Sequence, residues 1–114
     1  MPDDCLFCKI IAGTIPSETV YEDGVLVAFK DVHPIAPVHV LIVPREHVES
    51  VNGINESNQN LMGDLFAAAA RLARELGVAD DGYRCVINTN REAGQVVFHL
   101  HLHLIGGRPL HGLG

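Results

Sequence analysis

Three histidines stand at alternate positions near the end of the sequence, in the segment His99-Leu100-His101-Leu102-His103-Leu104-Ile105. Side chains of a β-strand alternate between its two faces, so the spacing predicts leucines on one face and histidines on the other, about 6.5–7 Å apart. Neutral imidazole is a common metal ligand, and beside other imidazoles it serves as a nucleophile towards phosphorus. The pattern therefore predicts a metal site or phosphate chemistry, the alternative being three polar residues on the solvent face of an edge strand.

A Cys-x-x-Cys pair, Cys5 and Cys8, forms a second group of candidate functional residues. Such a pair is the usual half of a zinc site and needs two further ligands. The third cysteine, Cys85, lies in an apolar segment and is typical of a small core residue. The best-placed histidines are His47 and His99, while two unrelated thiols or a redox dithiol are the alternatives.

Two helices are expected among the elements that position these residues. Apolar residues at three- and four-residue steps predict a long helix over about Ser57–Leu76, with Asn55 or Ser57 as N-cap and Gly77 just past its end. A short amphipathic helix is expected within 4–11, with Asp3 or Asp4 as its N-cap.

Five short β-type segments complete the predicted secondary structure, the first two joined by an Asp-Gly turn typical of hairpins. They are Thr19–Glu22, Val25–Phe29, His39–Val43, Arg84–Thr89 and Phe98–Ile105. This order predicts an α+β fold: an antiparallel five-stranded sheet, mostly in meander order, with one long and one short helix packed on one face. At 114 residues the chain is expected to form a single domain, 1–114.

Composition excludes several classes of protein. A net charge of −6 is unfavourable for binding a nucleic-acid backbone. No apolar run approaches the roughly 18 residues of a membrane-spanning helix, and the acidic start is unlike a signal peptide. Three cysteines, an odd number, fit a reducing compartment, so a cytoplasmic protein without nucleic-acid or membrane partners is expected.

The sequence resembles the histidine-triad (HIT) superfamily, and within it the Hint branch of nucleotide-binding phosphoramidases. The segment His99–Ile105 matches the His-φ-His-φ-His-φ-φ signature of that superfamily at every position. Further matching segments are spread along the chain, at 5–11, 15–16, 28–32, 36–44, 94–95 and 106–108. The resemblance therefore covers essentially the whole sequence and implies the HIT-like fold.

The resemblance implies a role for each matching residue. His101 corresponds to the nucleophile that attacks the α-phosphorus and forms a nucleotidyl-histidine, His103 to the residue that contacts phosphate oxygens and helps the leaving group, and His39 to a supporting histidine. Asp31 corresponds to the acid that holds the ribose hydroxyls, although a lone Asp in a loop more often caps a turn. The implied substrate-binding residues are Leu6, Phe7, Ile10, Phe29 and Val32 around the base, and Asn88, Gly94, Gln95, Val96 and Val97 on the phosphate side.

In the cysteine-bearing members, Cys5, Cys8, His47 and His99 correspond to a closed structural zinc site, one ion per chain. Two features depart from the family pattern. Val96 stands where typical Hint enzymes have a serine that contacts the phosphate or the leaving group, and the C-terminal segment lacks the tryptophan of animal members.

The resemblance and the histidine row together predict a hydrolase that cleaves purine nucleoside 5′-phosphoramidates to the nucleoside monophosphate and an amine. A weakly catalytic nucleotide-binding module, a metal-binding module and a dinucleoside polyphosphate hydrolase are the alternatives. A homodimer is also expected, because the chain is 47% hydrophobic and its sheet has an edge to protect.

Overall fold

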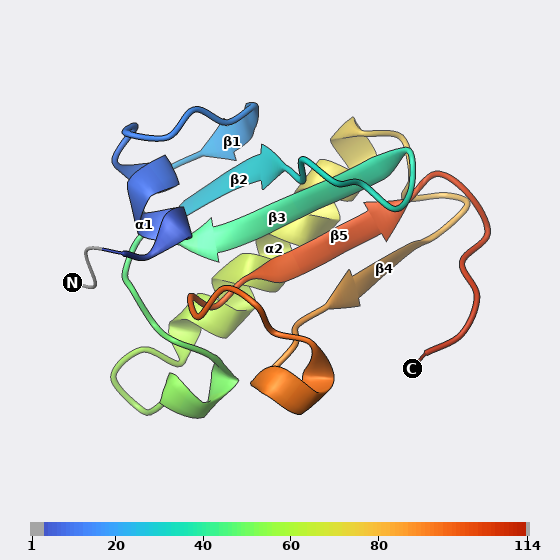
Figure 1. Cartoon of the computed structure of the whole chain (residues 1–114). Coiled ribbons are helices and arrows are strands. Elements are labelled where there is room, and N and C mark those ends of the chain that lie inside the picture. Colours follow the sequence, from blue (N-terminus) through green and yellow to red (C-terminus); the bar gives the residue numbers. More distant parts are fainter. Residues whose placement is uncertain (1–3, 114) are drawn as a thin grey trace.

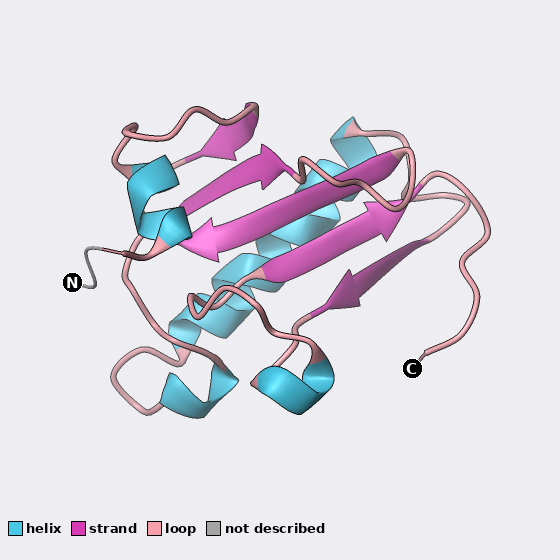
Figure 2. Cartoon of the chain, in the orientation of Figure 1, coloured by secondary structure: helices cyan, strands magenta, loops and turns pink. Residues whose placement is uncertain are grey.

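The part of the chain that the structure describes, residues 4–113, is built around a five-stranded antiparallel sheet in this computed structural model (Figure 1). Figure 2 shows two single-turn 3₁₀ helices in the loops beyond one end of the sheet, η1 (Val51–Gly53) and η2 (Arg91–Ala93). The helices are α1 (Leu6–Ile11) and α2 (Asn60–Glu75), and the strands are β1 (Thr19–Glu22), β2 (Leu26–Lys30), β3 (Val38–Pro44), β4 (Tyr83–Val86) and β5 (Leu102–Gly106).

The strands lie side by side in the order β1-β2-β3-β5-β4, and every neighbouring pair is antiparallel. The expected hairpin is confirmed, with Asp23 Oδ1 accepting the N–H groups of Val25 and Leu26, both at 2.7 Å. The meander prediction is wrong for the last two strands, because β5 inserts between β3 and β4. Leu102, Leu104 and Ile105 of β5 are buried, so β5 takes the interior position and the half-exposed β4 forms the edge.

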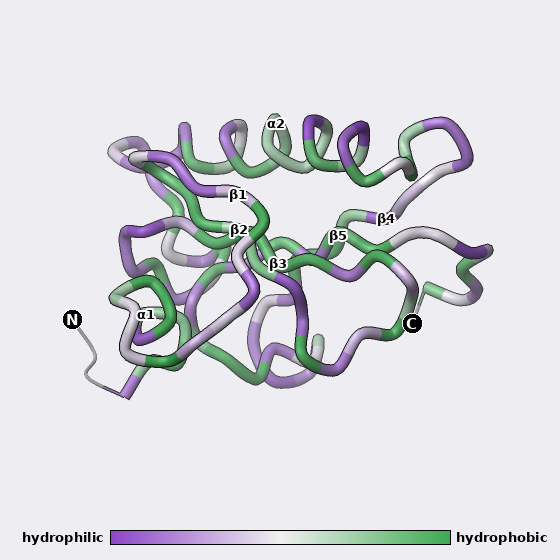
Figure 3. Tube along the Cα trace, turned by 90° about the horizontal axis from the view of Figure 1, so that it is seen from above, coloured by the Kyte–Doolittle hydropathy of each residue, from purple (hydrophilic) through white to green (hydrophobic). Residues whose placement is uncertain are grey.

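The two helices cover opposite faces of the sheet, so the prediction that both pack on one face is wrong (Figure 3). Strands β2 and β3 are apolar on both faces, and each face therefore needs cover. Alternate residues of these strands pack against α2, namely Leu26, Ala28, Val40 and Ile42. The residues between them, Val27, Phe29, Leu41 and Val43, pack against Phe7 and the two cysteines at α1.

The starts of both helices differ from expectation. Cys5 is the N-cap of α1, and its Sγ accepts the N–H of Cys8 at 3.4 Å, so Asp4 does not have this role and Asp3 lies outside the described residues. Helix α2 begins at Asn60 without a side-chain cap. Asn55 instead accepts from the N–H of Ser57, one turn earlier.

The end of the long helix is as predicted. Gly77 has φ +77°, a left-handed conformation in which glycine carries no steric penalty, directly after the last turn of α2. Neither helix of the described residues has the length and apolar content needed to cross a membrane.

Strand β5 begins at Leu102, so His99 and His101 precede it rather than lying within it. The segment before β5 turns away from β3, and the Leu100 N–H bonds the Val48 carbonyl instead. The predicted alternation nevertheless persists, because Leu100, Leu102 and Leu104 are fully buried in the core beneath α2. The histidines of the row lie on the other side, where Phe7 of α1 contacts His99 and His101.

We expect Leu72→Ala to lower the free energy of unfolding by about 2–5 kcal/mol, because Leu72 is 1% exposed and its loss leaves a cavity between α2 and the sheet. Urea denaturation followed by circular dichroism measures the change. The matched control is Leu113→Ala, which removes the same atoms from a side chain that is 96% exposed and should change stability by less than about 0.5 kcal/mol. Equal effects of the two variants would contradict the assigned core.

Candidate active site and metal cluster

His101 lies beneath α1 with its ring edge-on to Phe7, the ring centroids being 5.0 Å apart. Its Nδ1 is 2.6 Å from the carbonyl oxygen of His99. A carbonyl oxygen only accepts, so Nδ1 must carry a proton, and in the neutral ring the lone pair is then on Nε2. Burial lowers the pKa of His101, which keeps the ring neutral near pH 7. The structure thus provides a buried imidazole with a lone pair free for nucleophilic attack.

His103 and His39 form a second part of the same site. His39 Nε2 lies 3.0 Å from His103 Nδ1 and 3.3 Å from a carboxylate oxygen of Asp31. The His103 ring also adjoins that of His101, with centroids 5.0 Å apart. Burial, followed by the neighbouring His101 and His39, lowers the pKa of His103 to about 4, and burial lowers the pKa of His39 against the opposing effect of Asp31. All three imidazoles are therefore neutral near pH 7.

Strands β3 and β5 fix this arrangement through their register. Leu41 pairs with His103, and His39 pairs with Ile105. The two histidines are therefore diagonal neighbours on adjacent strands, offset by two residues, and their side chains share a face of the sheet. Asp31 lies just after β2, where its N–H bonds the His39 carbonyl at 3.0 Å. The side chains of a loop and two strands thereby meet at one end of the sheet.

Cys5, Cys8, His47 and His99 form a cluster able to hold a metal ion, with one donor atom from each residue and all four atoms within 4.8 Å of one another. Helix α1 supplies the two thiols, the segment after β3 supplies His47, and the segment before β5 supplies His99. The fold thus brings residues as far apart in sequence as Cys5 and His99, 94 positions, into one cluster.

The protonation state of His99 suits a metal ligand. His99 Nε2 lies 2.8 Å from the Pro44 carbonyl oxygen, so Nε2 carries the proton and the lone pair of Nδ1 faces the two thiols. Burial lowers the pKa of His99 to about 4, which keeps the ring neutral as a ligand must be. Burial and the adjoining Cys5 raise the pKa of Cys8 to about 11, so ionisation of this thiol needs a nearby positive charge.

The apolar residues predicted to surround a base gather around α1. Phe7 and Phe29 are buried in edge-to-face contact, with centroids 5.4 Å apart, and Ile10 packs on the same cluster. Leu6 is 42% exposed and Val32 is 81% exposed, so both offer apolar surface to a ligand. Phe7 links this apolar group to the histidines through its contact with His101.

The residues predicted on the phosphate side differ from one another in burial and in their contacts. Gln95 is buried, and its side chain is engaged with the main chain: Oε1 accepts the Asn90 N–H at 2.7 Å, and Nε2 donates to the carbonyls of Glu49 and Val97. Its contacts therefore shape the loop. The other members of the set lie around the same loop: Asn88 is half-buried after β4, Gly94 has φ +94°, Val96 is 86% exposed and Val97 packs on the Phe7 cluster.

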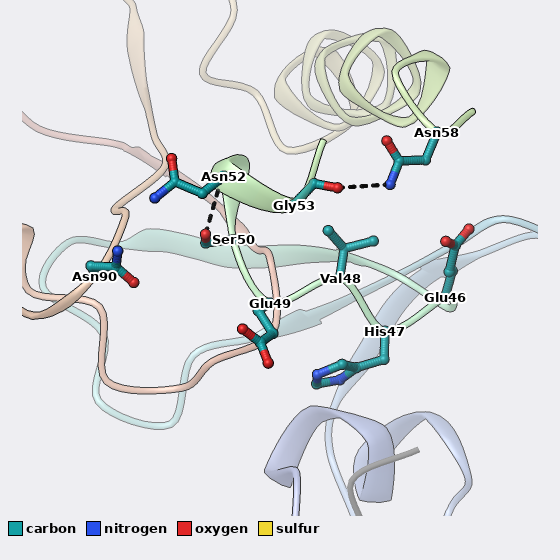
Figure 4. A pocket seen from close by; sticks show the side chains of 9 residues that line it. All are labelled: Glu46, His47, Val48, Glu49, Ser50, Asn52, Gly53, Asn58 and Asn90. Atoms are coloured by element: carbon teal, nitrogen blue, oxygen red, sulfur yellow. Dashed lines mark hydrogen bonds between the residues drawn. The ribbon is translucent and has the colours of Figure 1, made fainter. Parts of the chain in front are cut away.

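A pocket of ≈ 500 Å³ adjoins the Cys/His cluster, and its lining contains none of His39, His101 and His103 (Figure 4). Its lining is mostly polar, and hydrogen bonds from the Asn52 N–H to Ser50 and from Asn58 to the Gly53 carbonyl hold its wall. His47 belongs both to this pocket and to the metal cluster. The pocket is therefore connected to the Cys/His cluster through His47 and is separate from the group of His39, His101 and His103.

Main-chain groups are the contributors that the sequence did not reveal. The carbonyls of Pro44 and His99 and the N–H of Ile35 each bond one site histidine. Every residue except proline carries the same main-chain groups, so no residue type marks these positions.

Comparison with known proteins identifies the class to which this fold and site belong. A family model described as HIT domain matches residues 12–110, and the chain belongs to that family. A relative from Escherichia coli (strain K12), called purine nucleoside phosphoramidase, is 44% identical over 110 residues, which cover 96% of this chain and 92% of that protein.

Solved structures give the same assignment. A HIT family hydrolase from Clostridium thermocellum has a TM-score of 0.95 and 48% identity, covering 99% of this chain and 98% of the other. A histidine triad protein from Clostridium difficile has a TM-score of 0.95 and 37% identity, covering 100% and 99%. The family and the fold expected from the sequence are confirmed.

Proposed function

We propose that this chain is a hydrolase that cleaves the P–N bond of purine nucleoside 5′-phosphoramidates, releasing the nucleoside monophosphate and an amine. The observation that carries the proposal is the neutral His101 ring, whose lone pair is on Nε2 beside His103 and His39. The Escherichia coli relative that is 44% identical carries the name of this activity, which supports the same conclusion.

In the first step, His101 Nε2 attacks the α-phosphorus, the P–N bond breaks with its electron pair going to nitrogen, and the leaving amine takes up a proton. The phosphorylated ring is then cationic, and the His99 carbonyl that accepts from its Nδ1–H stabilises the new charge. In the second step water attacks the phosphorus, the bond to Nε2 breaks, and a proton is released. This returns His101 to its neutral form.

We place the base of the nucleotide against the apolar group around Phe7 and Phe29, and the ribose hydroxyls at Asp31. Asp31 adjoins the histidines of the site, since its carboxylate lies 3.3 Å from His39. Val97 packs on the Phe7 cluster from the loop that Gln95 holds. A nucleotide bound there would bring its α-phosphate to His101 and His103.

We expect His101→Ala and His101→Gly to lower kcat for adenosine phosphoramidate by at least about 10³-fold, because no other group supplies the nucleophile. A fluorogenic phosphoramidate assay measures this, with circular dichroism to show that the fold is kept. His111→Ala, on the exposed C-terminal segment, is the matched control. Turnover of His101→Ala equal to that of the control would exclude His101 as the nucleophile.

Val96 favours a second candidate, a nucleotide-binding module with little catalysis. Its side chain is 86% exposed and offers no hydroxyl to a phosphate or leaving group. Tight adenosine monophosphate binding by calorimetry, without turnover of any phosphoramidate, would select this function. The third possibility, a dinucleoside polyphosphate hydrolase, would turn over diadenosine polyphosphates faster than phosphoramidates when the two substrates are compared.

We further propose that Cys5, Cys8, His47 and His99 bind one structural Zn²⁺. Tetrahedral zinc needs ligand atoms about 3.3 Å apart for two nitrogens and about 3.5–3.6 Å apart for nitrogen and sulfur. The two Nδ1 atoms are 3.2 Å apart, and three nitrogen–sulfur separations are 3.3, 3.4 and 3.5 Å. Four protein ligands leave no position open for substrate, so the ion would tie α1 to the segments after β3 and before β5.

We expect purified protein to contain about one zinc per chain, and Cys8→Ser to lose it with a large fall in Tm and a smaller fall in activity well below Tm. Elemental analysis, thermal melts and the phosphoramidate assay in EDTA measure these effects. Cys85→Ser, outside the cluster, is the control that should keep the metal. Less than half an equivalent of zinc after metal-replete purification, or chelation that abolishes turnover while the fold survives, would contradict the structural role.

We also propose that the chain forms a homodimer through α2 and the edge strand β4. Phe66 on α2 is 48% exposed and Tyr83 on β4 is 38% exposed, which leaves apolar surface on both elements. Light scattering at micromolar concentration should give twice the 12.3 kDa of one chain. A mass equal to that of one chain would contradict the dimer.

A further inference from the structure

Both main-chain polar groups of Ile35 are hydrogen-bonded, although the residue is 59% exposed. Its N–H donates to His39 Nδ1 at 3.2 Å, and its carbonyl accepts from Arg108 Nη2 at 2.8 Å. The neighbouring Gly107 packs directly on the same loop, since a Cβ there would lie 2.9 Å from Pro37. The segment after β5 thus holds the loop in contact with His39.

The bond from Ile35 determines which nitrogen of His39 carries the proton. A main-chain N–H only donates, so Nδ1 must offer its lone pair, and the neutral ring then carries its proton on Nε2. His39 is 7% exposed, and burial lowers its pKa, so the neutral form prevails near pH 7. The negatively charged Asp31 carboxylate lies 3.3 Å from Nε2 and favours a proton on that nitrogen.

The tautomer of His39 in turn determines that of His103. His39 Nε2–H donates to His103 Nδ1 at 3.0 Å, so Nδ1 of His103 is unprotonated. The neutral His103 ring then carries its proton on Nε2. His101, in the adjacent ring, has the opposite tautomer, because its Nδ1 donates to the His99 carbonyl. Two neighbouring rings therefore offer a lone pair for phosphorus and an N–H for a phosphate oxygen.

We propose that Ile35, through its main-chain N–H and with Arg108 holding its carbonyl, is the positioning residue that makes His103 present Nε2–H to the substrate phosphate. A neutral N–H in a buried site stabilises developing negative charge on oxygen without a proton transfer. In the other tautomer, His103 Nε2 would turn a lone pair towards that oxygen and repel it. This role rests on the proposed phosphoryl chemistry, but the tautomers themselves are independent of it.

The same bond bears on the group Asp31, His39 and His103, whose donor atoms also lie within 4.8 Å of one another. A metal there would need the lone pair of His39 Nε2, which is the atom that carries the proton while Ile35 donates to Nδ1. With that proton in place, the group is not arranged to bind a metal ion.

The direct test is the tautomer of each histidine, read from long-range ¹H–¹⁵N correlation spectra of zinc-loaded protein with ¹⁵N-labelled histidine at pH 7. We expect Nε2–H for His39 and His103 in the wild type and in Ile35→Ala, which keeps the main-chain donor. Ile35→Pro removes that donor, and both rings should then shift towards Nδ1–H. Retention of full Nε2–H in Ile35→Pro would overturn the proposal.

A second pair of variants serves if Ile35→Pro does not fold. Arg108→Ala frees the Ile35 carbonyl and should give mixed tautomers at His39, whereas Arg108→Lys keeps a donor and should restore Nε2–H. Wild-type tautomers in Arg108→Ala would exclude the role of Arg108.

Kinetics link the tautomers to function. Relative to Ile35→Ala, Ile35→Pro should lower kcat for adenosine phosphoramidate by about 10²-fold, as for removal of one donor to a developing oxyanion, with KM changed less than about threefold. Altered tautomers with an unchanged kcat would overturn the catalytic consequence. If the wild-type protein cleaves no phosphoramidate, the proposed function fails, and the spectra still decide the tautomers.

Discussion

Burial of Leu100, Leu102 and Leu104 against α2 is the constraint that positions the three imidazoles of the row, His99, His101 and His103. Because side chains alternate along an extended chain, burying the leucines on one side forces the intervening histidines to the other. A shift of one residue would move three leucines out of the core and three imidazoles into it. The hydrophobic effect acts on the leucines, and the polar histidines are positioned as a consequence.

Burial on the α1 side then makes the imidazoles neutral, and main-chain groups decide where each proton lies. The carbonyls of Pro44 and His99 take the N–H of His99 and His101, which leaves Nδ1 bare in the first ring and Nε2 bare in the second. Two histidines only two residues apart thereby offer opposite nitrogens, one suited to a metal and the other to phosphorus. Desolvation and fixed dipoles together give identical side chains different chemistry.

The Cys5, Cys8, His47 and His99 cluster and the group of His39, His101 and His103 are linked by shared elements, although no residue belongs to both. Helix α1 and its N-cap supply Cys5 and Cys8 to the cluster, and the same helix places Phe7 against His101, so whatever holds the cluster together also holds Phe7 in place. His99 and His101 lie on one short segment before β5, which links the two groups along the chain. The stability of the cluster and the geometry of the other histidines are therefore coupled through short segments of the same chain.

Alternation and helical periodicity are local properties, and they determined most of what could be predicted from the sequence. The row His99–Ile105 determined which histidines share a side, the steps within 57–76 determined the long helix, and the Asp23 turn determined the first hairpin. The sequence resemblance, carried by the same motifs, determined the family. These features are readable because each depends on residues close together in the chain.

Only the tertiary structure decided which face of the sheet α1 covers, that β5 lies between β3 and β4, and that the histidine row bends before the strand begins. These depend on competition for burial between segments far apart in sequence. The tertiary structure alone also decided the proton positions, because Ile35, Pro44 and His99 act through main-chain groups. Every residue except proline carries those groups, so only the folded chain determines which of them meets an imidazole.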